Sequence, residues 1–263
     1  MSPPQFVDTH VHLNNADLAA DLPGVLERAV KAGVERFVVV GWDLASSERA
    51  VVLAGGDSRI FAVVGVHPHD AQHWDAATAV RLREWARNPR VIAIGEIGLD
   101  FYRDLSPRPA QEVAFRAQLA LAAEIGLPVV IHCRDAYDET LAILESDAGR
   151  EIPVILHCFL GTMAHAQRLW SRGWFVGVDG PITFKANEDL RAILRAAPRE
   201  SLLLETDAPY LSPTPFRGRF PNEPSRLLPI AEKVAEVRGE TLHVVADFTT
   251  ANAHRAFPRL TPP

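Results

Sequence analysis

Short apolar runs alternate along the whole chain with longer segments in which apolar residues recur at helical spacing. One such helical stripe runs from Leu18 to Val30, and another ends near Gly126 and Pro128. The apolar runs, rich in β-branched residues, are Gln5–Asp8, Arg36–Val40, Ile60–Val66, Val91–Ile94, Val129–Ile131, Val154–Leu156, Trp174–Val178 and Leu202–Leu204. This alternation predicts a repeat of strand and helix.

Continuous apolar strands are typical of a parallel sheet covered by helices, and about eight units favour a (β/α)₈ TIM barrel. The chain has 263 residues, of which 48% are hydrophobic, which suits a single barrel domain over residues 1–263. A doubly wound open sheet is the alternative. Polar residues stand where most runs end, and only a barrel brings all of those carboxyl ends to one mouth. We therefore expect a barrel with its active site at the C-terminal mouth of the strands.

Four histidines and two carboxylates at the ends of these runs predict a metal site. His10 and His12 are two residues apart, so an extended strand points both to the face that also carries Asp8. A bare His-x-His pair would fit hydrogen-bonded structural residues equally well. Burying all six groups without an ion would leave unpaired acceptors and charge. The six are His10, His12, Glu96, His132, His157 and Asp207.

Six motifs resemble the successive motifs of the TatD family, in order and over nearly the whole chain. They are Asp8–Leu13, Gly65–His69, Ile94–Tyr102, Leu127–Arg134, Leu156–Phe159 and Leu204–Leu211. That family belongs to the amidohydrolase-like metal barrels, so the resemblance implies a (β/α)₈ fold and DNA hydrolysis assisted by two divalent metal ions. It also implies that His10, His12 and Asp207 hold one ion, that His132 and His157 hold the other, and that Glu96 bridges them.

The donor set limits the metal and the mechanism. Mixed nitrogen and oxygen ligands suit Zn²⁺, Mn²⁺ or Fe²⁺ better than Mg²⁺, although metal availability leaves Mg²⁺ open. No lysine ends an apolar run, so a carboxylate, Glu96, must bridge the ions. We expect phosphodiester hydrolysis by a metal-activated water that Asp207 orients or deprotonates. Asp8 and Glu205 are expected to support the ligands through hydrogen bonds.

Further residues are candidates for substrate binding. His67 ends its own run and is the best candidate for a phosphate contact, with Tyr102, Arg103 and Arg134 around it. Arg134 could equally brace the site by pairing with Asp100 or Asp135. More local charge and stacking faces come from Arg217, Arg219, Phe184 and Tyr210, whereas His69, His73, His165, His243 and His254 are interpreted as surface or structural residues.

Charge and composition bear on how DNA could be attracted and on where the protein is located. The net charge is -6 with no block of Lys or Arg, so DNA would have to be attracted locally. Two cysteines, no signal-peptide pattern and no long apolar run predict a cytoplasmic protein without membrane contact, and we expect a monomer. Cys133 and Cys158 each follow a proposed ligand, and strand alternation predicts that they point outward beneath the helices.

The resemblance extends to exonuclease action from the 3′ end of single-stranded or end-accessible DNA, and to repair at abasic sites. Two alternatives remain: another metal hydrolase on this barrel, such as a D-aminoacyl-tRNA deacylase, or a barrel that binds partners without catalysis. The complete ligand set argues against the second alternative. Fold and metal site alone do not exclude the first, because the mouth loops select the substrate.

Overall fold

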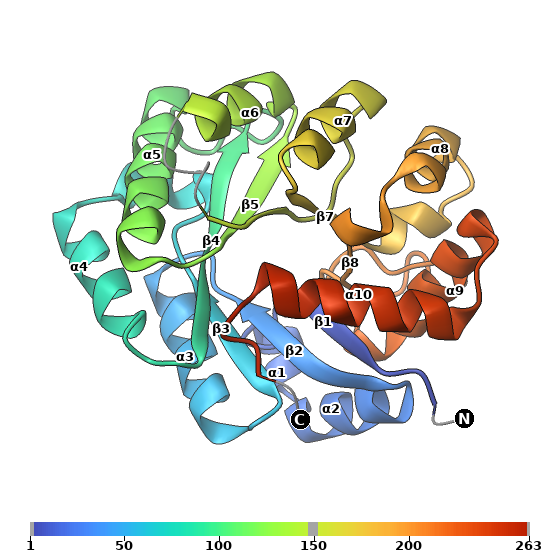
Figure 1. The fold of residues 1–263 in the computed structure, drawn as a ribbon. Helices are drawn as coiled ribbons and strands as arrows, with labels where there is room; N and C mark the ends of the chain where they lie inside the picture. The colour runs from blue at the N-terminus through green and yellow to red at the C-terminus, as the bar shows by residue number, and fades with distance from the viewer. Residues whose placement is uncertain (1–2, 147–151, 262–263) are drawn as a thin grey trace.

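The computed structural model describes residues 3–146 and 152–261, and its centre is an eight-stranded parallel sheet in the order β1 to β8 (Figure 1). The strands are β1 (Phe6–Val11), β2 (Val34–Val40), β3 (Ile60–Val64), β4 (Val91–Asp100), β5 (Val129–Arg134), β6 (Val154–Leu156), β7 (Phe175–Val178) and β8 (Leu202–Leu204). The barrel is closed where Val11 bridges Ala208 just after β8. The predicted TIM barrel is confirmed, and the open sheet is excluded.

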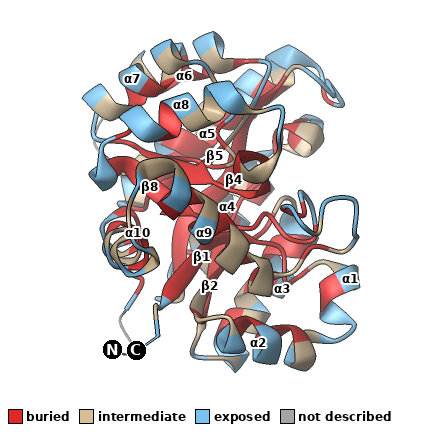
Figure 2. Ribbon diagram, turned by 90° about the vertical axis from the view of Figure 1, so that its right-hand side faces the viewer, coloured by how far each residue is buried: buried red, intermediate tan, exposed pale blue. Residues whose placement is uncertain are grey.

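Helices follow the strands and pack around the outside of the barrel (Figure 1). They are α1 (Ala16–Ala19), α2 (Leu22–Lys31), α3 (Leu44–Gly56), α4 (Ala76–Trp85), α5 (Arg108–Ile125), α6 (Tyr137–Ser146), α7 (Met163–Ser171), α8 (Glu188–Ala196), α9 (Leu227–Arg238) and α10 (Leu242–Ala256). Short 3₁₀ turns are η1 (Pro68–His73), η3 (Gly180–Thr183), η4 (Arg199–Ser201) and η5 (Pro224–Arg226). Figure 2 shows the strands buried and the outer helix faces exposed.

Local signals set where the helices begin and end. The side chains of Asp43, Asp75 and Thr162 accept hydrogen bonds from the first-turn backbone of α3, α4 and α7. Gly126 and Gly239 end α5 and α9 with φ of 68° and 66°, a left-handed conformation that glycine adopts without steric penalty.

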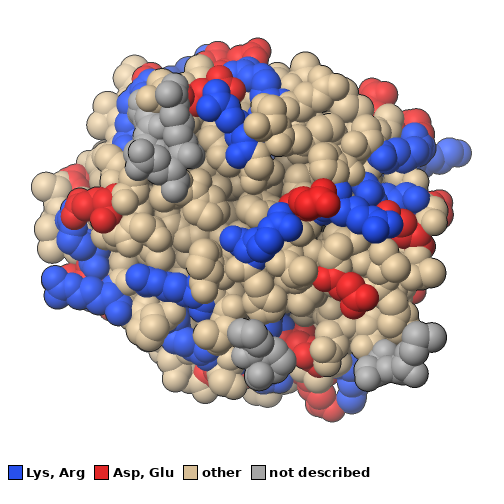
Figure 3. All heavy atoms as spheres, viewed as in Figure 1, with Lys and Arg blue, Asp and Glu red and all other residues tan. Residues whose placement is uncertain are grey.

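The amino-terminal end of the barrel is filled by apolar side chains. Phe257 and Leu260, at the end of α10 and beyond it, are buried with Val7, Phe61 and Ile92 of the barrel interior. Figure 3 shows this closed face, on which basic and acidic side chains lie next to one another around α10. The polar ends of the strands therefore meet at the opposite end. Within the described residues, no helix is long and apolar enough to span a membrane.

Candidate metal centre

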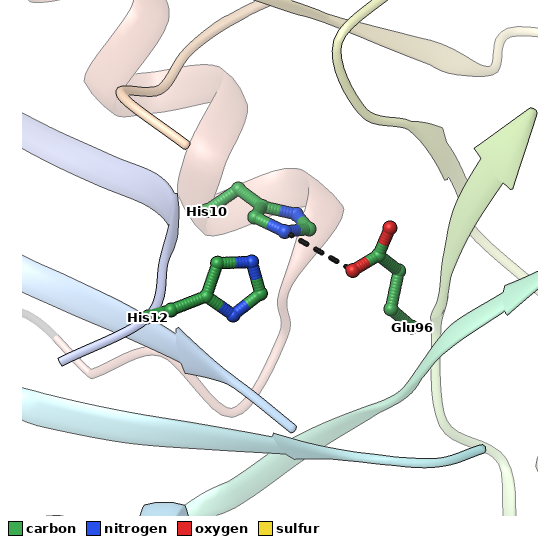
Figure 4. A group of neighbouring side chains, drawn as sticks. All are labelled: His10, His12 and Glu96. Carbon is green, nitrogen blue, oxygen red and sulfur yellow. Dashed lines mark ion pairs between the residues drawn. The ribbon is translucent and has the colours of Figure 1, made fainter. Parts of the chain in front are cut away.

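His10 is the most buried of the predicted ligands and has no hydrogen-bond partner for either ring nitrogen among the described residues. Its Nε2 atom lies 3.6 Å from Glu96 Oε2 and 3.8 Å from Asp207 Oδ1, and Figure 4 shows the imidazole facing Glu96. Burial, followed by the neighbouring His157, lowers the pKa of His10 to about 4. The ring is therefore neutral at pH 7, and a lone pair is available for a cation.

His12 is oriented by the backbone of β2. Its Nδ1 donates a hydrogen bond to the Val40 carbonyl at 3.0 Å, because a carbonyl oxygen can only accept. The opposite nitrogen, Nε2, then carries the lone pair and lies 3.4 Å from Asp207 Oδ1. A backbone bond that fixes the tautomer of a metal-ligating histidine is the usual arrangement in protein metal sites.

The two carboxylate oxygens of Glu96 face different groups of ligands. Oε2 faces His10, whereas Oε1 lies 2.9 Å from His132 Nδ1 and 2.8 Å from His157 Nε2. Burial opposes ionisation of Glu96, but the charges of His157 and His67 and further hydrogen bonds hold its pKa well below the usual range. A charged carboxylate with one oxygen toward each histidine group has the geometry of a bridging ligand.

His132 is held by Asp100, which the sequence suggested only as a partner of Arg134. Asp100, the last residue of β4, accepts hydrogen bonds at Oδ2 from His132 Nε2 at 3.0 Å and from His69 Nε2 at 2.8 Å. Burial lowers the pKa of His132, but Asp100 and Glu96 outweigh it and raise that pKa to about 9. His69 thus belongs to the network behind the site. The sequence signal that could have indicated this was the position of His69, two residues after the candidate His67.

Closure of the barrel puts Asp207 beside His10 and His12. The Asp207 amide donates to the His10 carbonyl at 3.0 Å, and the His12 amide donates to the Ala208 carbonyl at 2.8 Å. Asp8, on β1, accepts from the amide and hydroxyl of Thr206 at 3.0 and 2.6 Å, next to Asp207. The predicted supporting role of Asp8 is therefore consistent with its contacts.

Glu205 lies behind His157, and its carboxylate occupies space that is free only because residue 177 is a glycine. Its Oε1 atom is 3.8 Å from His157 Nδ1 and accepts from the Cys158 amide. A Cβ atom on Gly177 of β7 would come within 2.2 Å of the Glu205 carboxylate. Burial raises the pKa of Glu205 well above its usual value. This position matches the predicted supporting role and not a ligand position.

The prediction for Cys158 was wrong, whereas Cys133 lies near a helix as expected and also lines the cavity. Cys133 lies near Thr140 of α6, and burial raises the pKa of its thiol to about 12. Cys158 follows the end of β6 with φ of 43°, so strand alternation no longer applies, and it contacts Asp179 beside the mouth. Asp179 was not foreseen in the sequence analysis; burial, then the charge of Asp207, raises its pKa to about 8.

The spacing of the donor atoms tests whether a cation fits. Ligands bonded at ~2.1 Å in tetrahedral geometry stand roughly 3.4 Å apart. Three sets of donor atoms, all within 4.8 Å of one another, occur in the described residues. They are His10, His12 and Glu96; His10, His157 and Asp207; and His67, Glu96 and His132. The converging lone pairs and the partnerless His10 ring fit divalent cations.

The donor atoms face a cavity of about 730 Å³ at the C-terminal mouth of the barrel. His67, Arg103 and Arg134 line it, whereas Tyr102 is 60% exposed at its edge. The Arg134 guanidinium carbon stands 3.8 Å from the centre of the Tyr102 ring, and among the described residues Arg134 has no ion pair with Asp100 or Asp135. His67 Nε2 also lies 3.5 Å from Glu96 Oε1. His67 therefore stands beside the proposed metal ligands themselves, and not only where it could contact a phosphate.

The sequence matches the family model described as "TatD related DNase" over residues 7–258. A protein from Escherichia coli K12 named "3'-5' ssDNA/RNA exonuclease TatD" is 39% identical over 254 residues, which cover 95% of this chain and 98% of that protein. The metal-dependent hydrolase YabD of Bacillus subtilis strain 168 is also 39% identical, over 250 residues and the same shares. The crystal structure of a TatD homologue from Escherichia coli K12 superimposes with a TM-score of 0.91 at 31% identity, with 98% of each chain covered.

Proposed function

This chain belongs to the family of TatD-related DNases, and from that premise we propose that it is an exonuclease that removes nucleotides from the 3′ end of single-stranded DNA. As a member of that family it is a metal-dependent hydrolase. RNA is included in the proposal, because the relatives in Escherichia coli and Shigella flexneri are named for both nucleic acids. The named relatives favour nucleic-acid hydrolysis over the deacylase alternative.

The observation that carries the proposal is the division of the Glu96 oxygens between two groups of buried donors. On one side, His10, His12 and Asp207 would hold one divalent ion. On the other side, His132 and His157 would hold the second ion, and Glu96 would contribute one oxygen to each. Two bound ions supply a water of lowered pKa and positive charge beside a phosphodiester.

Asp207 is proposed to position the attacking water and to take its proton. Its carboxylate is buried, yet contacts with His12 and His10 keep its pKa below the usual value, so it is charged and can accept a hydrogen bond. The backbone bonds across the β1 and β8 junction fix its direction. A positioned base of this kind typically contributes ~10²–10⁴ in rate.

The substrate is proposed to enter through the cavity with its phosphates near His67, Arg103 and Arg134. The stacked pair of Arg134 and Tyr102 offers a cation for a phosphate and a ring face for an unpaired base. Cytoplasmic location, a monomeric state and repair at abasic sites stay predictions from the sequence.

End-labelled oligonucleotides test the proposal. With a 5′ label, the enzyme should give a ladder that shortens with time, whereas a 3′ label should appear at once in mononucleotide. The Asp207→Asn variant serves as the inactive control on the same substrates. Release of the 5′ label as mononucleotide from the start of the reaction, or cleavage of an aminoacyl-RNA ester with no cleavage of DNA or RNA, would contradict the proposal.

A further inference from the structure

Two loops beside the mouth are joined by a row of contacts that leads outward from the cavity. The loop after β7 and the loop after β8 meet first at Gly180, where an added Cβ would come 1.8 Å from the Leu211 carbonyl oxygen. Next, the Thr214 amide donates to the Thr183 hydroxyl at 2.8 Å. Leu211 lines the cavity, so the row begins at the cavity wall.

The row ends at a group of cations and rings, which we call the outer basic surface: Phe184, which is half-buried, and Lys185, Arg217, Arg219 and Phe220, which are exposed. The Arg217 guanidinium carbon stands 4.3 Å from the centre of the Phe184 ring, and Phe220 is 61% exposed. Lys185, Arg217 and Arg219 are exposed, and none of them has a carboxylate partner among the described residues. The surface therefore offers free positive charge next to aromatic faces.

Neighbouring acids weaken this charge only in part. Glu188, at the start of α8, is paired with Arg191 at 2.9 Å and with Arg195. Asp189 in the same turn is exposed. Three cations on the two loops thus exceed the one acid of α8 that has no partner among the described residues. A positive surface is notable on a chain whose net charge is -6.

The loop after β8 is held in place although it contains no long helix. Arg226 donates at 2.8 Å to the Ser212 hydroxyl and at 3.0 Å to the Pro221 carbonyl. Ser212 in turn donates to the carbonyl of Arg219. These bonds tie both ends of the segment that carries Arg217 and Arg219. A prearranged surface loses little conformational entropy when a ligand binds.

We propose that the outer basic surface binds the part of a single strand that lies beyond the cavity, with phosphates on Arg217 and Arg219 and bases on Phe184 and Phe220. The inference rests on the proposed nuclease function and adds a second contact region to it. Nucleic acid fits better than an acidic protein, because an unpaired strand alternates phosphates with stacking faces and both loops present cations beside rings. The consequence is that affinity should rise with strand length.

The test compares oligothymidylates of about 3 and about 15 nucleotides, since only the longer strand extends past the cavity. The Arg217→Ala/Arg219→Ala variant should raise KM for the long strand by about tenfold and for the short one by less than about twofold. The salt dependence of long-strand binding should weaken, with the slope of log K against log salt falling by about 1.4. Phe184→Leu should show the same length dependence without the change in slope.

Arg81→Ala is the control for loss of positive charge elsewhere on the surface, because Arg81 also stands over a ring, that of Trp85 at 4.9 Å on α4; it removes one charge where the double variant removes two. It should behave as the parent on both strands. Equal effects of the double variant on the two lengths, or no effect on either, would overturn the inference. Failure of the parent enzyme to cleave either strand would instead refute the proposed function, so the two failures are distinguishable. Normal melting of the variants shows that the fold is kept.

Discussion

Replacing Asp100 by Asn should loosen one of the two proposed metal sites, because Asp100 orients the His132 ring through its Nε2 atom, on the side opposite Glu96. Its Oδ2 atom accepts from two imidazole nitrogens, those of His132 and His69. Its Oδ1 atom accepts from the amides of Tyr102 and Arg103 at 3.0 and 2.7 Å. All four partners are donors.

An asparagine cannot satisfy this arrangement in either orientation. Its amide nitrogen is a donor, so it must face either the two imidazole donors or the two backbone donors. In the isosteric variant the Asn amide N–H groups therefore face other N–H donors at a buried position. The His132 ring loses its fixed acceptor and can turn. Loss of such a support typically weakens metal affinity ~10–100-fold, which corresponds to roughly 1.4–2.7 kcal/mol.

Metal titration of the Asp100→Asn protein, followed by calorimetry or by competition with a chelator, measures this effect. We expect the ion held by His132 to bind about 10- to 100-fold more weakly, with a smaller change for the ion near His12. Asp247→Asn on the exposed side of α10 makes the same chemical change away from the mouth and should bind both ions normally. Affinities of Asp100→Asn within about twofold of the parent at both sites would refute the orienting role.

Three further predictions concern the ligands and their surroundings. Glu96→Ala should lower metal content at both sites, whereas Asp207→Asn should keep the second ion and DNA affinity while single-turnover cleavage falls by ~10²–10⁴ or more; near-parental cleavage would remove Asp207 from the mechanism. Replacing Cys133 and Cys158 together by Ala should leave metal content largely intact, and loss of metal from the folded variant would show that a thiol is a ligand. Gly177→Ala should destabilise the fold by about 1–3 kcal/mol, seen as a lower Tm, because its Cβ would press on the Glu205 carboxylate; an unchanged Tm would show that this region can yield.

The strand ends were predictable because burial on both faces leaves an unbroken apolar run that a polar ligand interrupts. For His132 and His157 this signal places the side chain directly. For Asp100 it failed, because β4 continues to residue 100, six residues past the predicted end, through Gly95 and Gly98. Glycines in a strand hide its continuation from a periodicity argument.

Orientation just beyond a strand was not predictable from alternation. Cys158 has a positive φ, which turns its side chain toward Asp179 instead of outward beneath the helices. Contacts between loops that are distant in sequence also leave no pattern in the sequence. The contact of Arg217 with the Phe184 ring is one of them. Sequence patterns thus picked out the residues proposed as metal ligands, whereas the supporting and substrate-facing contacts required the fold.

The most direct test of the central claim is cleavage of 5′-labelled single-stranded DNA by protein stripped of metal and shown by elemental analysis to be metal-free. Among the described residues no serine lines the cavity, and burial raises the pKa of both cysteine thiols that line it, so water activation depends on cations. Metal-free protein should leave the strand intact, and Mn²⁺, Mg²⁺ or Zn²⁺ added back should restore a ladder that shortens from the 3′ end. Undiminished cleavage by the metal-free protein would contradict the account.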